Sequence, residues 1–288
     1  MSGINKLNVV LLALTGFGNA VLESLLDDAR VNVGAVFTNK YDNPFPYYAE
    51  EQLDELCRQR QVNCYLDVKV NSIEGVELVV KHAPDLIIVA TFKQILKERV
   101  LSLPTLGVVN VHPSLLPHYR GPCPTNAALL NGENTTGVTI HYVTETVDEG
   151  NLLLQRSIAI GDSENDGQLR LRLARLAGEM MPELIEMFAG TSRPAGTPQD
   201  HSRANFAPKP TTEDGFLEQA TDILAIQRKI RAYNPHPGTS ILIGDRRVAV
   251  DRFEILPRNG TDGIYENGNA IDLIISSQAI RLYKKSEA

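Results

Sequence analysis

Nearly unbroken apolar runs alternate with amphipathic segments over the first 190 residues of the chain. Short apolar runs of this kind are typical of parallel strands that helices cover on both faces. Strands are expected at 7–14, 31–38, 64–65, 85–91, 107–112, 137–143 and 151–160. Helices are expected at 19–26, 48–60, 75–82, 97–101, 121–131 and 168–189. The alternation predicts an α/β fold with a Rossmann-like, doubly wound and mostly parallel sheet.

The composition changes after this region. Residues 190–212 are rich in Gly, Pro, Ser and Thr and show no hydrophobic period, which indicates a linker. An amphipathic stretch and then short β-type runs, separated by turn residues, follow it. These short runs predict a small β-rich, OB-like unit in the form of a barrel or sandwich. We therefore expect a large α/β domain at 1–190, a linker at 191–212 and a small β-rich domain at 213–288.

Composition narrows the class of protein. The chain is 43% hydrophobic and 22% charged, as in ordinary globular proteins, and no apolar run is long enough to cross a membrane. Its net charge of −7 disfavours a general nucleic-acid binder. The three cysteines are odd in number and lack metal-type spacing, which favours free thiols in a reducing compartment. We expect a cytoplasmic protein without a metal.

Candidate chemistry lies at the end of the strand expected at 107–112. Asn110 and His112 are two residues apart, so they project to the same side, and Pro113 ends the strand. Open α/β sheets bind ligands at this end of their strands. With Asp148, the set offers an imidazole that exchanges protons near neutrality, a carboxylate that orients it and an amide for a developing oxyanion. Because no Cys or Lys belongs to the set, direct acyl transfer to an amine is favoured.

Other interpretations of these residues remain open. His112 could be structural, or it could form a hydrolase triad with Ser114 and Asp148, although the Gly-x-Ser-x-Gly context is missing. A metal site built from His112, His118 and His141 lacks ligand spacing.

Two further features of the sequence each allow a structural and a functional interpretation. Gly16 and Gly18 could form a tight turn or cradle a phosphate, but the third glycine of that pattern is absent. The cluster Phe45–Tyr48 could be a substrate wall or a packed loop.

Longer motifs resemble a known family. Asn110–Gly121, Asn131–Glu133 and Gly137–Gly150 are similar, in order and spacing, to the 10-formyltetrahydrofolate-dependent formyltransferases. The resemblance covers essentially the whole chain. Phe206–Lys209 and Ile230–Gly238 resemble the start of the small C-terminal domain of methionyl-tRNA and sugar-nucleotide formyltransferases, with His236 in place of a common Trp.

The resemblance implies an enzyme that uses 10-formyltetrahydrofolate as cosubstrate and no metal. It implies that Asn110 and His112 contact the formyl oxygen and help proton transfer, and that Asp148 assists through His112 or water. The residues implied for folate are Ile87, Ile88, Val89, Ala90, Phe92, Ile140 and Tyr142, largely through backbone contacts. Those expected at the acceptor are Ser114, Tyr119, Arg120, Tyr47 and Tyr48. A homodimer is also a family expectation.

The acceptor amine is less constrained. Methionyl-tRNA formyltransferases carry a basic insertion after the second strand, whereas Thr38–Tyr48 is nearly free of basic residues and contains an Asp-Asn-Pro typical of amino-sugar enzymes. Residues 213–288 hold 10 Lys and Arg against 11 Asp and Glu, unlike a surface for tRNA phosphates. We expect the amine of a nucleotide-linked amino sugar. The alternatives are methionyl-tRNA, hydrolysis of formyltetrahydrofolate, and an inactive folate- or nucleotide-binding module.

Overall fold

The computed structural model describes residues 6–40, 51–189, 193–218 and 222–285. The chain forms two compact units, each of which combines separate stretches of sequence. The N-terminal unit contains Met1–Gly121, Thr135–Ile158 and Arg170–Phe206. The C-terminal unit contains Pro122–Asn134, Ala159–Leu169 and Ala207–Ala288. The domain limits expected at 190 and 212 remain a prediction.

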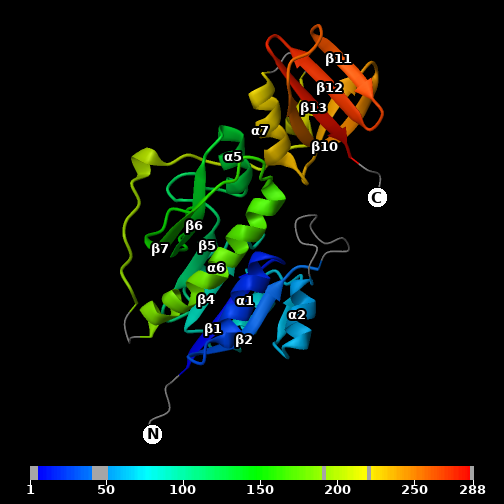
Figure 1. The fold of residues 1–288 in the computed structure, drawn as a ribbon. Helices are drawn as coiled ribbons and strands as arrows, with labels where there is room; N and C mark the ends of the chain where they lie inside the picture. The colour runs from blue at the N-terminus through cyan, green and yellow to red at the C-terminus, as the bar shows by residue number, and fades with distance from the viewer. Residues whose placement is uncertain (1–5, 41–50, 190–192, 219–221, 286–288) are drawn as a thin grey trace. The chain divides into compact units, whose positions relative to one another are not determined.

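A seven-stranded sheet forms the centre of the N-terminal unit, in the order β3-β2-β1-β4-β5-β6-β7 (Figure 1). The strands are β1 Leu7–Ala13, β2 Val31–Thr38, β3 Cys64–Leu66, β4 Leu86–Ala90, β5 Val108–His112, β6 Thr135–Tyr142 and β7 Leu152–Ala159. Neighbours from β3 to β5 pair in parallel, whereas β6 runs antiparallel to β5. The predicted α/β fold with a mostly parallel sheet is confirmed.

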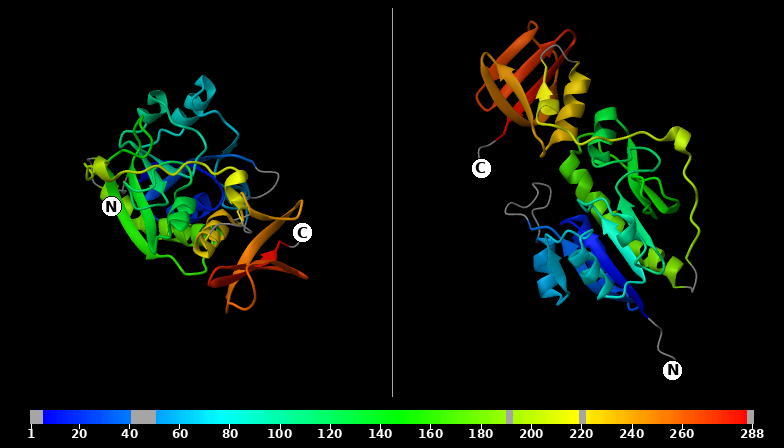
Figure 2. Two further views of the ribbon diagram at one scale, coloured as in Figure 1. Left: turned by 90° about the horizontal axis from the view of Figure 1, so that it is seen from above. Right: turned by 180° about the vertical axis from the view of Figure 1, so that it is seen from behind.

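Helices cover this sheet because its strands are apolar on both faces. They are α1 Phe17–Asp27, α2 Leu53–Gln59, α3 Ile73–Val80, α4 Glu98–Leu101 and α6 Asp166–Phe188. Figures 1 and 2 show α1 and α6 against the same face of the sheet. All five residues of β4 are buried, as expected for an interior strand with no polar face.

The first strand leads into a tight turn. Gly16 has a φ of 98°, and its N–H donates to the Asn19 side chain at 3.0 Å. At Gly18 an added Cβ would lie 2.6 Å from a methyl carbon of Leu53, so this position has no room for a side chain. The turn is packed against protein, which favours a structural role over a phosphate cradle.

One expected helix begins later than its sequence suggests. The helix expected from Gly121 is α5, Pro124–Asn131, with proline in the first turn, where its missing N–H is harmless. Gly121 lies before the helix with a φ of 101°, so its N–H is available to another partner. That partner is Asp148, described below.

The C-terminal unit has a six-stranded sheet in the order β11-β12-β13-β10-β9-β8. Its strands are β8 Phe216–Leu217, β9 Thr239–Ile243, β10 Arg246–Leu256, β11 Gly263–Asn267, β12 Ala270–Ile275 and β13 Gln278–Lys284. Helix α7, Ile223–Tyr233, buries Ile226 and Ile230 in the same apolar cluster as strand residues such as Leu282. The expected β-rich unit is confirmed, with β8 and β11 as strands that sequence patterns did not predict.

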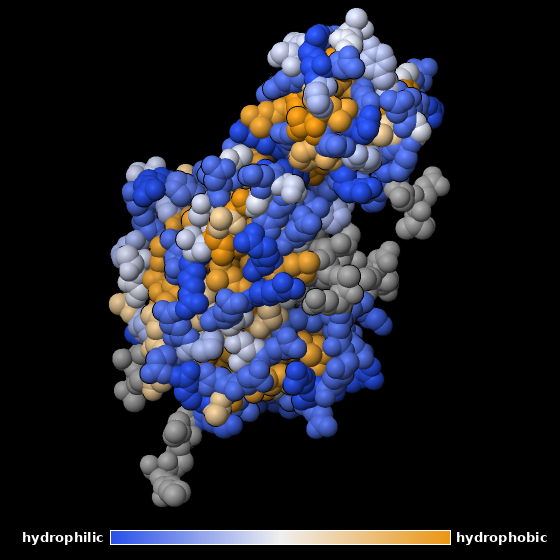
Figure 3. Space-filling view, viewed as in Figure 1, coloured by the Kyte–Doolittle hydropathy of each residue, from blue (hydrophilic) through white to orange (hydrophobic). Residues whose placement is uncertain are grey.

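Hydrophilic residues cover much of the face shown in Figure 3, with apolar groups between them. In the described part of the chain, no helix is both long and apolar enough to cross a membrane.

Candidate functional site

The end of β5 carries two of the three residues predicted to form the reaction centre. Asn110 and His112 lie two apart in this strand, and Asp148 comes from the loop between β6 and β7. Asn110 Nδ2 is 3.3 Å from Asp148 Oδ1, and His112 Nδ1 is 3.5 Å from Asp148 Oδ2. The structure therefore brings the three residues together in one polar cluster.

The His112 ring is buried, with 3% of the residue exposed. Its Nε2 lies 2.9 Å from the Tyr119 carbonyl oxygen, which can only accept, so Nε2 carries a hydrogen and donates. Burial lowers the pKa of His112, and the Asp148 carboxylate offsets this in part. In the neutral ring, Nδ1 is unprotonated and faces Asp148. Nδ1 is therefore the position at which this ring can take up a proton.

Asp148 is held as a carboxylate by the groups around it. Burial alone would raise the pKa of Asp148, but the His112 and His141 rings and the Gly121 N–H together lower it. The Gly121 N–H donates to Asp148 Oδ2 at 2.8 Å. The Asp148 side chain is 11% exposed and that of His112 is 4% exposed. Of the two groups, Asp148 is thus the more accessible to a substrate.

A second imidazole, that of His141, also belongs to the cluster. In the antiparallel register of β5 and β6, His141 stands opposite Asn110. Its Nδ1 donates to the Tyr142 carbonyl oxygen at 2.8 Å, which leaves Nε2 to accept from Asn110 Nδ2 at 3.2 Å. Sequence reasoning considered His141 only as a metal ligand. The described residues contain no group of three His, Cys, Asp or Glu side chains arranged to hold a metal ion.

The loop after β5 contains three residues expected at the acceptor. Ser114 is fully buried, and its hydroxyl donates to the His118 carbonyl oxygen at 2.7 Å rather than to His112, so the geometry does not support a hydrolase triad. Tyr119 is 8% exposed and has a φ of 60°. Arg120 is 7% exposed. Tyr47 and Tyr48 lie outside the described residues, and the acceptor contacts of the whole set stay a prediction.

Arg120 is engaged on several sides by protein. Its guanidinium donates to Glu149 Oε1 at 2.9 Å, to Gln199 Oε1 at 2.8 Å and to His201 Nδ1 at 3.1 Å. Gln199 and His201 belong to the segment expected as a linker, and sequence patterns did not single them out. Arg120 thus connects the loop after β5 with both the Asp148 loop and this segment.

The residues expected to contact folate lie on or just after β4 and on β6, the two strands that flank β5. Ile87, Ile88, Ala90 and Ile140 are 0% exposed, Val89 is 8% and Tyr142 is 4% exposed, and Phe92 is half-buried. The Tyr142 hydroxyl donates to the Pro194 carbonyl oxygen at 2.6 Å. Most of these side chains are buried within the protein, and their contacts with folate stay a prediction.

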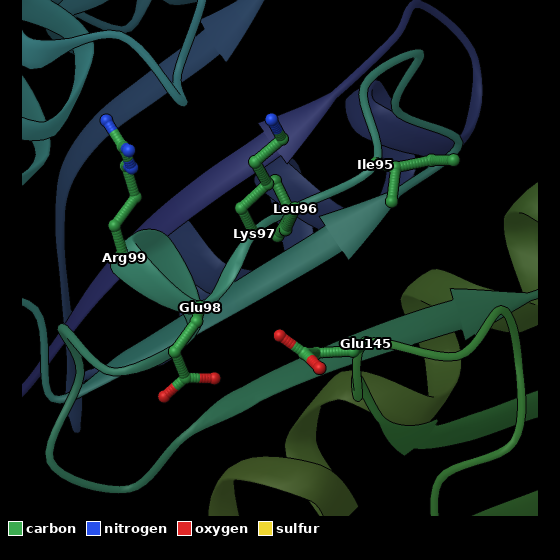
Figure 4. A pocket seen from close by; sticks show the side chains of 6 residues that line it. All are labelled: Ile95, Leu96, Lys97, Glu98, Arg99 and Glu145. Carbon is green, nitrogen blue, oxygen red and sulfur yellow. The ribbon is translucent and has the colours of Figure 1, made fainter.

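A hollow of about 450 Å³ lies beside the segment that follows β4. It is lined by Ile95–Arg99, which follows β4, and by Glu145 of the β6–β7 loop. Figure 4 shows the carboxylates of Glu98 and Glu145 directed toward the same gap, while Lys97 and Arg99 extend to the other side. Ile95 is 69% exposed, so an apolar surface is available there.

Comparison with known proteins identifies the family. The family model described as formyl transferase matches residues 7–185. The methionyl-tRNA formyltransferase of Thermotoga maritima is 36% identical over 259 residues, which is 89% of this chain and 82% of that protein. The methionyl-tRNA formyltransferase of Kosmotoga olearia is 39% identical over 194 residues, which is 67% of this chain. This second match spans 62% of the length of the Kosmotoga protein.

Solved structures show the same fold. The N-formyltransferase from Helicobacter canadensis, solved with folinic acid and dTDP-3-aminofucose, superposes with a TM-score of 0.70 at 17% identity, covering 97% of this chain and 100% of that one. HypX from Aquifex aeolicus, solved with tetrahydrofolic acid, gives a TM-score of 0.65 at 19% identity over 95% of this chain and 43% of that one. The chain belongs to the formyl transferase family, as its motifs predicted.

Proposed function

We propose that this protein transfers a formyl group from 10-formyltetrahydrofolate to a primary amine, and that this amine belongs to a nucleotide-linked amino sugar. The family and its relatives support formyl transfer from a formyl folate. The observation that carries the proposal is the position of Asp148, whose Oδ2 accepts from Gly121 N–H and faces His112 Nδ1 at 3.5 Å. An ionised carboxylate and a neutral imidazole side by side can receive and pass on one proton.

The folate supplies the formyl group, which the amine attacks at carbon while the bond to folate nitrogen breaks. Asp148, the more exposed group, receives the proton that the amine loses. His112 can take that proton at Nδ1, because its Nε2–H is already held by the Tyr119 carbonyl oxygen, and the proton then passes to the folate nitrogen, which leaves as an N–H group. The resulting imidazolium would donate to Tyr119 and to Asp148, so both of its N–H groups would be satisfied.

Asn110 supports the formyl oxygen in this proposal. Its Nδ2 is shared between His141 Nε2 at 3.2 Å and Asp148 Oδ1 at 3.3 Å, both long for hydrogen bonds. Such contacts are weak, and catalytic hydrogen bonds often shorten only when substrate binds. Exchange of one of them for a formyl oxygen that becomes negative would therefore be favourable. The folate itself would lie along β4 and over the hollow beside Ile95.

The amino-sugar acceptor is supported by the distribution of charge. Among the described residues of the C-terminal unit, five arginines form ion pairs, including Arg246 with Glu266 and Arg247 with Glu213. Arginines whose charge is balanced in this way bind phosphates weakly, and tRNA recognition depends on phosphate neutralisation. A second candidate is methionyl-tRNA, which is favoured by the names of relatives at 36% and 39% identity.

The test is a formylation assay read by mass spectrometry. Purified protein and 10-formyltetrahydrofolate are incubated with dTDP- and UDP-linked amino sugars, with methionyl-tRNA at physiological salt, or with no amine. With the wild-type protein, we expect the formyl mass to appear on an amino sugar. With the His112→Ala variant, we expect no formylation, although this variant should still bind folate. Formylation of tRNA alone would establish the second candidate. Release of tetrahydrofolate without an amine would instead indicate hydrolysis, and no turnover in any arm would favour an inactive binding module.

A further inference from the structure

The backbone of Asp148 adopts a conformation that needs support. Its φ is 56°, in the left-handed region that non-glycine residues seldom occupy. Such residues cluster at functional sites and persist only where the surroundings hold them in place. Asp148 also lies in a connecting loop, between β6 and β7, rather than in a strand. The groups that bind this loop therefore determine where the carboxylate lies.

Gln199 binds the loop with its whole amide. Its Nε2 donates to the carbonyl oxygens of Asp148 and Gly150, at 2.8 Å each, and its Oε1 accepts from Arg120 at 2.8 Å. Carbonyl oxygens only accept and a guanidinium only donates, so the amide can be satisfied in one orientation. The residue is 6% exposed, which shields these hydrogen bonds from water.

The segment that carries Gln199 is itself fixed to the sheet. Thr197 and Leu152 exchange two backbone hydrogen bonds of 2.8 Å, and Asn151 Nδ2 donates to the Ala195 carbonyl oxygen at 3.1 Å. These bonds attach the segment at the start of β7, immediately after the Asp148 loop. Gln199 thus reaches the loop from a fixed base rather than from a free connection.

We infer that Gln199 is a positioning residue for the reaction, which holds the Asp148 carboxylate at His112. The inference rests on the proposed function of Asp148. Without the two donated hydrogen bonds, the loop can relax from the left-handed conformation and carry the carboxylate away from His112 Nδ1. Misplacement of a catalytic group by about 1 Å can lower turnover by about 10²-fold.

The first test is Gln199→Leu, which keeps the shape of the side chain and removes its hydrogen bonds. We expect kcat to fall by about 10²-fold, with the KM for folate unchanged. The Gln199→Glu side chain can still accept from Arg120 but cannot donate to the two carbonyl oxygens, so we expect a similar fall in kcat. The matched control is Gln94→Leu. Gln94 binds two backbone groups in the same way, since it accepts from Val70 N–H at 3.1 Å and donates to the Val68 carbonyl oxygen at 2.7 Å. We expect the Gln94→Leu variant to keep the kcat of the wild type.

A double-mutant cycle separates positioning from general loss of structure. In an Asp148→Asn background, Gln199→Leu should lower kcat by less than about twofold, because the group that it positions is already gone. A further full loss in that background would overturn the inference, as would normal turnover of Gln199→Glu.

A measurement that needs no turnover completes the test. The groups that face the His112 ring are Asp148, His141 and the Tyr119 carbonyl oxygen. Burial lowers the pKa of this ring and His141 adds to that effect, whereas Asp148 and, to a smaller extent, the Tyr119 carbonyl oxygen raise it. NMR titration of the ring should therefore show a lower pKa in Gln199→Leu than in the wild type. An unchanged titration would overturn the inference even if the protein formylated no amine. If the pKa of the His112 ring is lower in Gln199→Leu but the wild type formylates no amine, only the proposed function would be contradicted.

Discussion

Two aspartates with nearly the same exposure have different partners in the two units of this protein. The side chain of Asp148 in the N-terminal unit is 11% exposed and that of Asp272 in the C-terminal unit is 13% exposed. Asp272 accepts from Arg281 Nε and a terminal nitrogen of Arg281, at 2.7 and 2.8 Å. Asp148 faces imidazole nitrogens of His112 and His141, at 3.5 and 3.4 Å.

The difference lies in whether the countercharge is permanent. Arg281 is always protonated, so the two-point pair with Asp272 is complete and has no capacity for a further proton. Imidazoles can gain and lose a proton near neutrality, so the charge of Asp148 is left to stabilise a transient cation. The same residue type thus serves structure in one unit and, in our proposal, chemistry in the other.

The most severe test of this contrast is Asp148→Asn. The asparagine oxygen can keep the Oδ2 position, where it accepts from Gly121 N–H, and the amide nitrogen then takes the Oδ1 position, which faces Asn110 and His141. The variant therefore lacks both the carboxylate that receives the proton and the negative charge that stabilises a protonated His112. General acid–base groups contribute about 10²- to 10⁴-fold, so we expect kcat to fall by about 10³-fold. Steady-state formylation of the identified acceptor measures this fall. A fall in kcat of less than tenfold would show that Asp148 does not receive the proton of the amine.

A smaller effect is expected at Gly150, which brings the Asp148 loop close to β6. An added Cβ here would lie 1.8 Å from the Tyr142 carbonyl oxygen, so Gly150→Ala must displace backbone. Overpacking of this kind costs about 1–3 kcal/mol, and the displacement should also reduce kcat. Urea unfolding measures the loss. The control is Gly161→Ala, where the nearest atom to an added Cβ is 3.4 Å away; equal stability of the two variants would contradict this packing argument.

The main features of the site were predictable because they lie in short, continuous motifs. Asn110 and His112 share a strand face, and the long ordered motif placed Asp148 with them. His141 was missed because its contact with Asn110 depends on β5 and β6 pairing antiparallel, whereas the alternation of strands and helices favours parallel pairing. Its position opposite Asn110 follows from register, which a hydrophobic pattern does not specify for a strand buried on both faces.

Gln199 was missed for a different reason. It lies 51 residues after Asp148, in a stretch whose Gly and Pro content resembles a flexible linker. Composition indicates only that such a stretch lacks a regular helix or strand, and it cannot show which side chains fold back on a sheet. In the fold, likewise, the long strands and helices were predicted within a few residues. The short strands β8 and β11 were not, since they depend on pairing with β9 and β12.

The free energy of unfolding should depend on pH because His112 is buried as a neutral ring. Burial lowers the pKa of His112 in the folded protein, while the unfolded chain keeps the ordinary value of about 6.5. The unfolded state therefore binds the proton at higher pH, so this contribution to stability is complete above about pH 6.5 and declines as the pH falls below it. Urea unfolding between pH 7.5 and 5.5 should show a steeper decline for the wild type than for His112→Gln. Parallel declines would mean that His112 does not change its pKa on folding.

The smallest effect on stability and turnover is expected for Asp272→Asn, which removes the ion pair between Asp272 and Arg281. The pair lies on strands β12 and β13, where Asp272 and Arg281 are direct cross-strand neighbours. Pairs near the surface add little to stability because water solvates both partners well in the unfolded chain. We expect the melting temperature to fall by at most a few degrees and kcat at saturating folate to stay within about twofold of the wild type. The chemical change equals that of Asp148→Asn, so a comparable loss of kcat in both variants would show that exposure, rather than the permanence of the countercharge, decides what an aspartate does here.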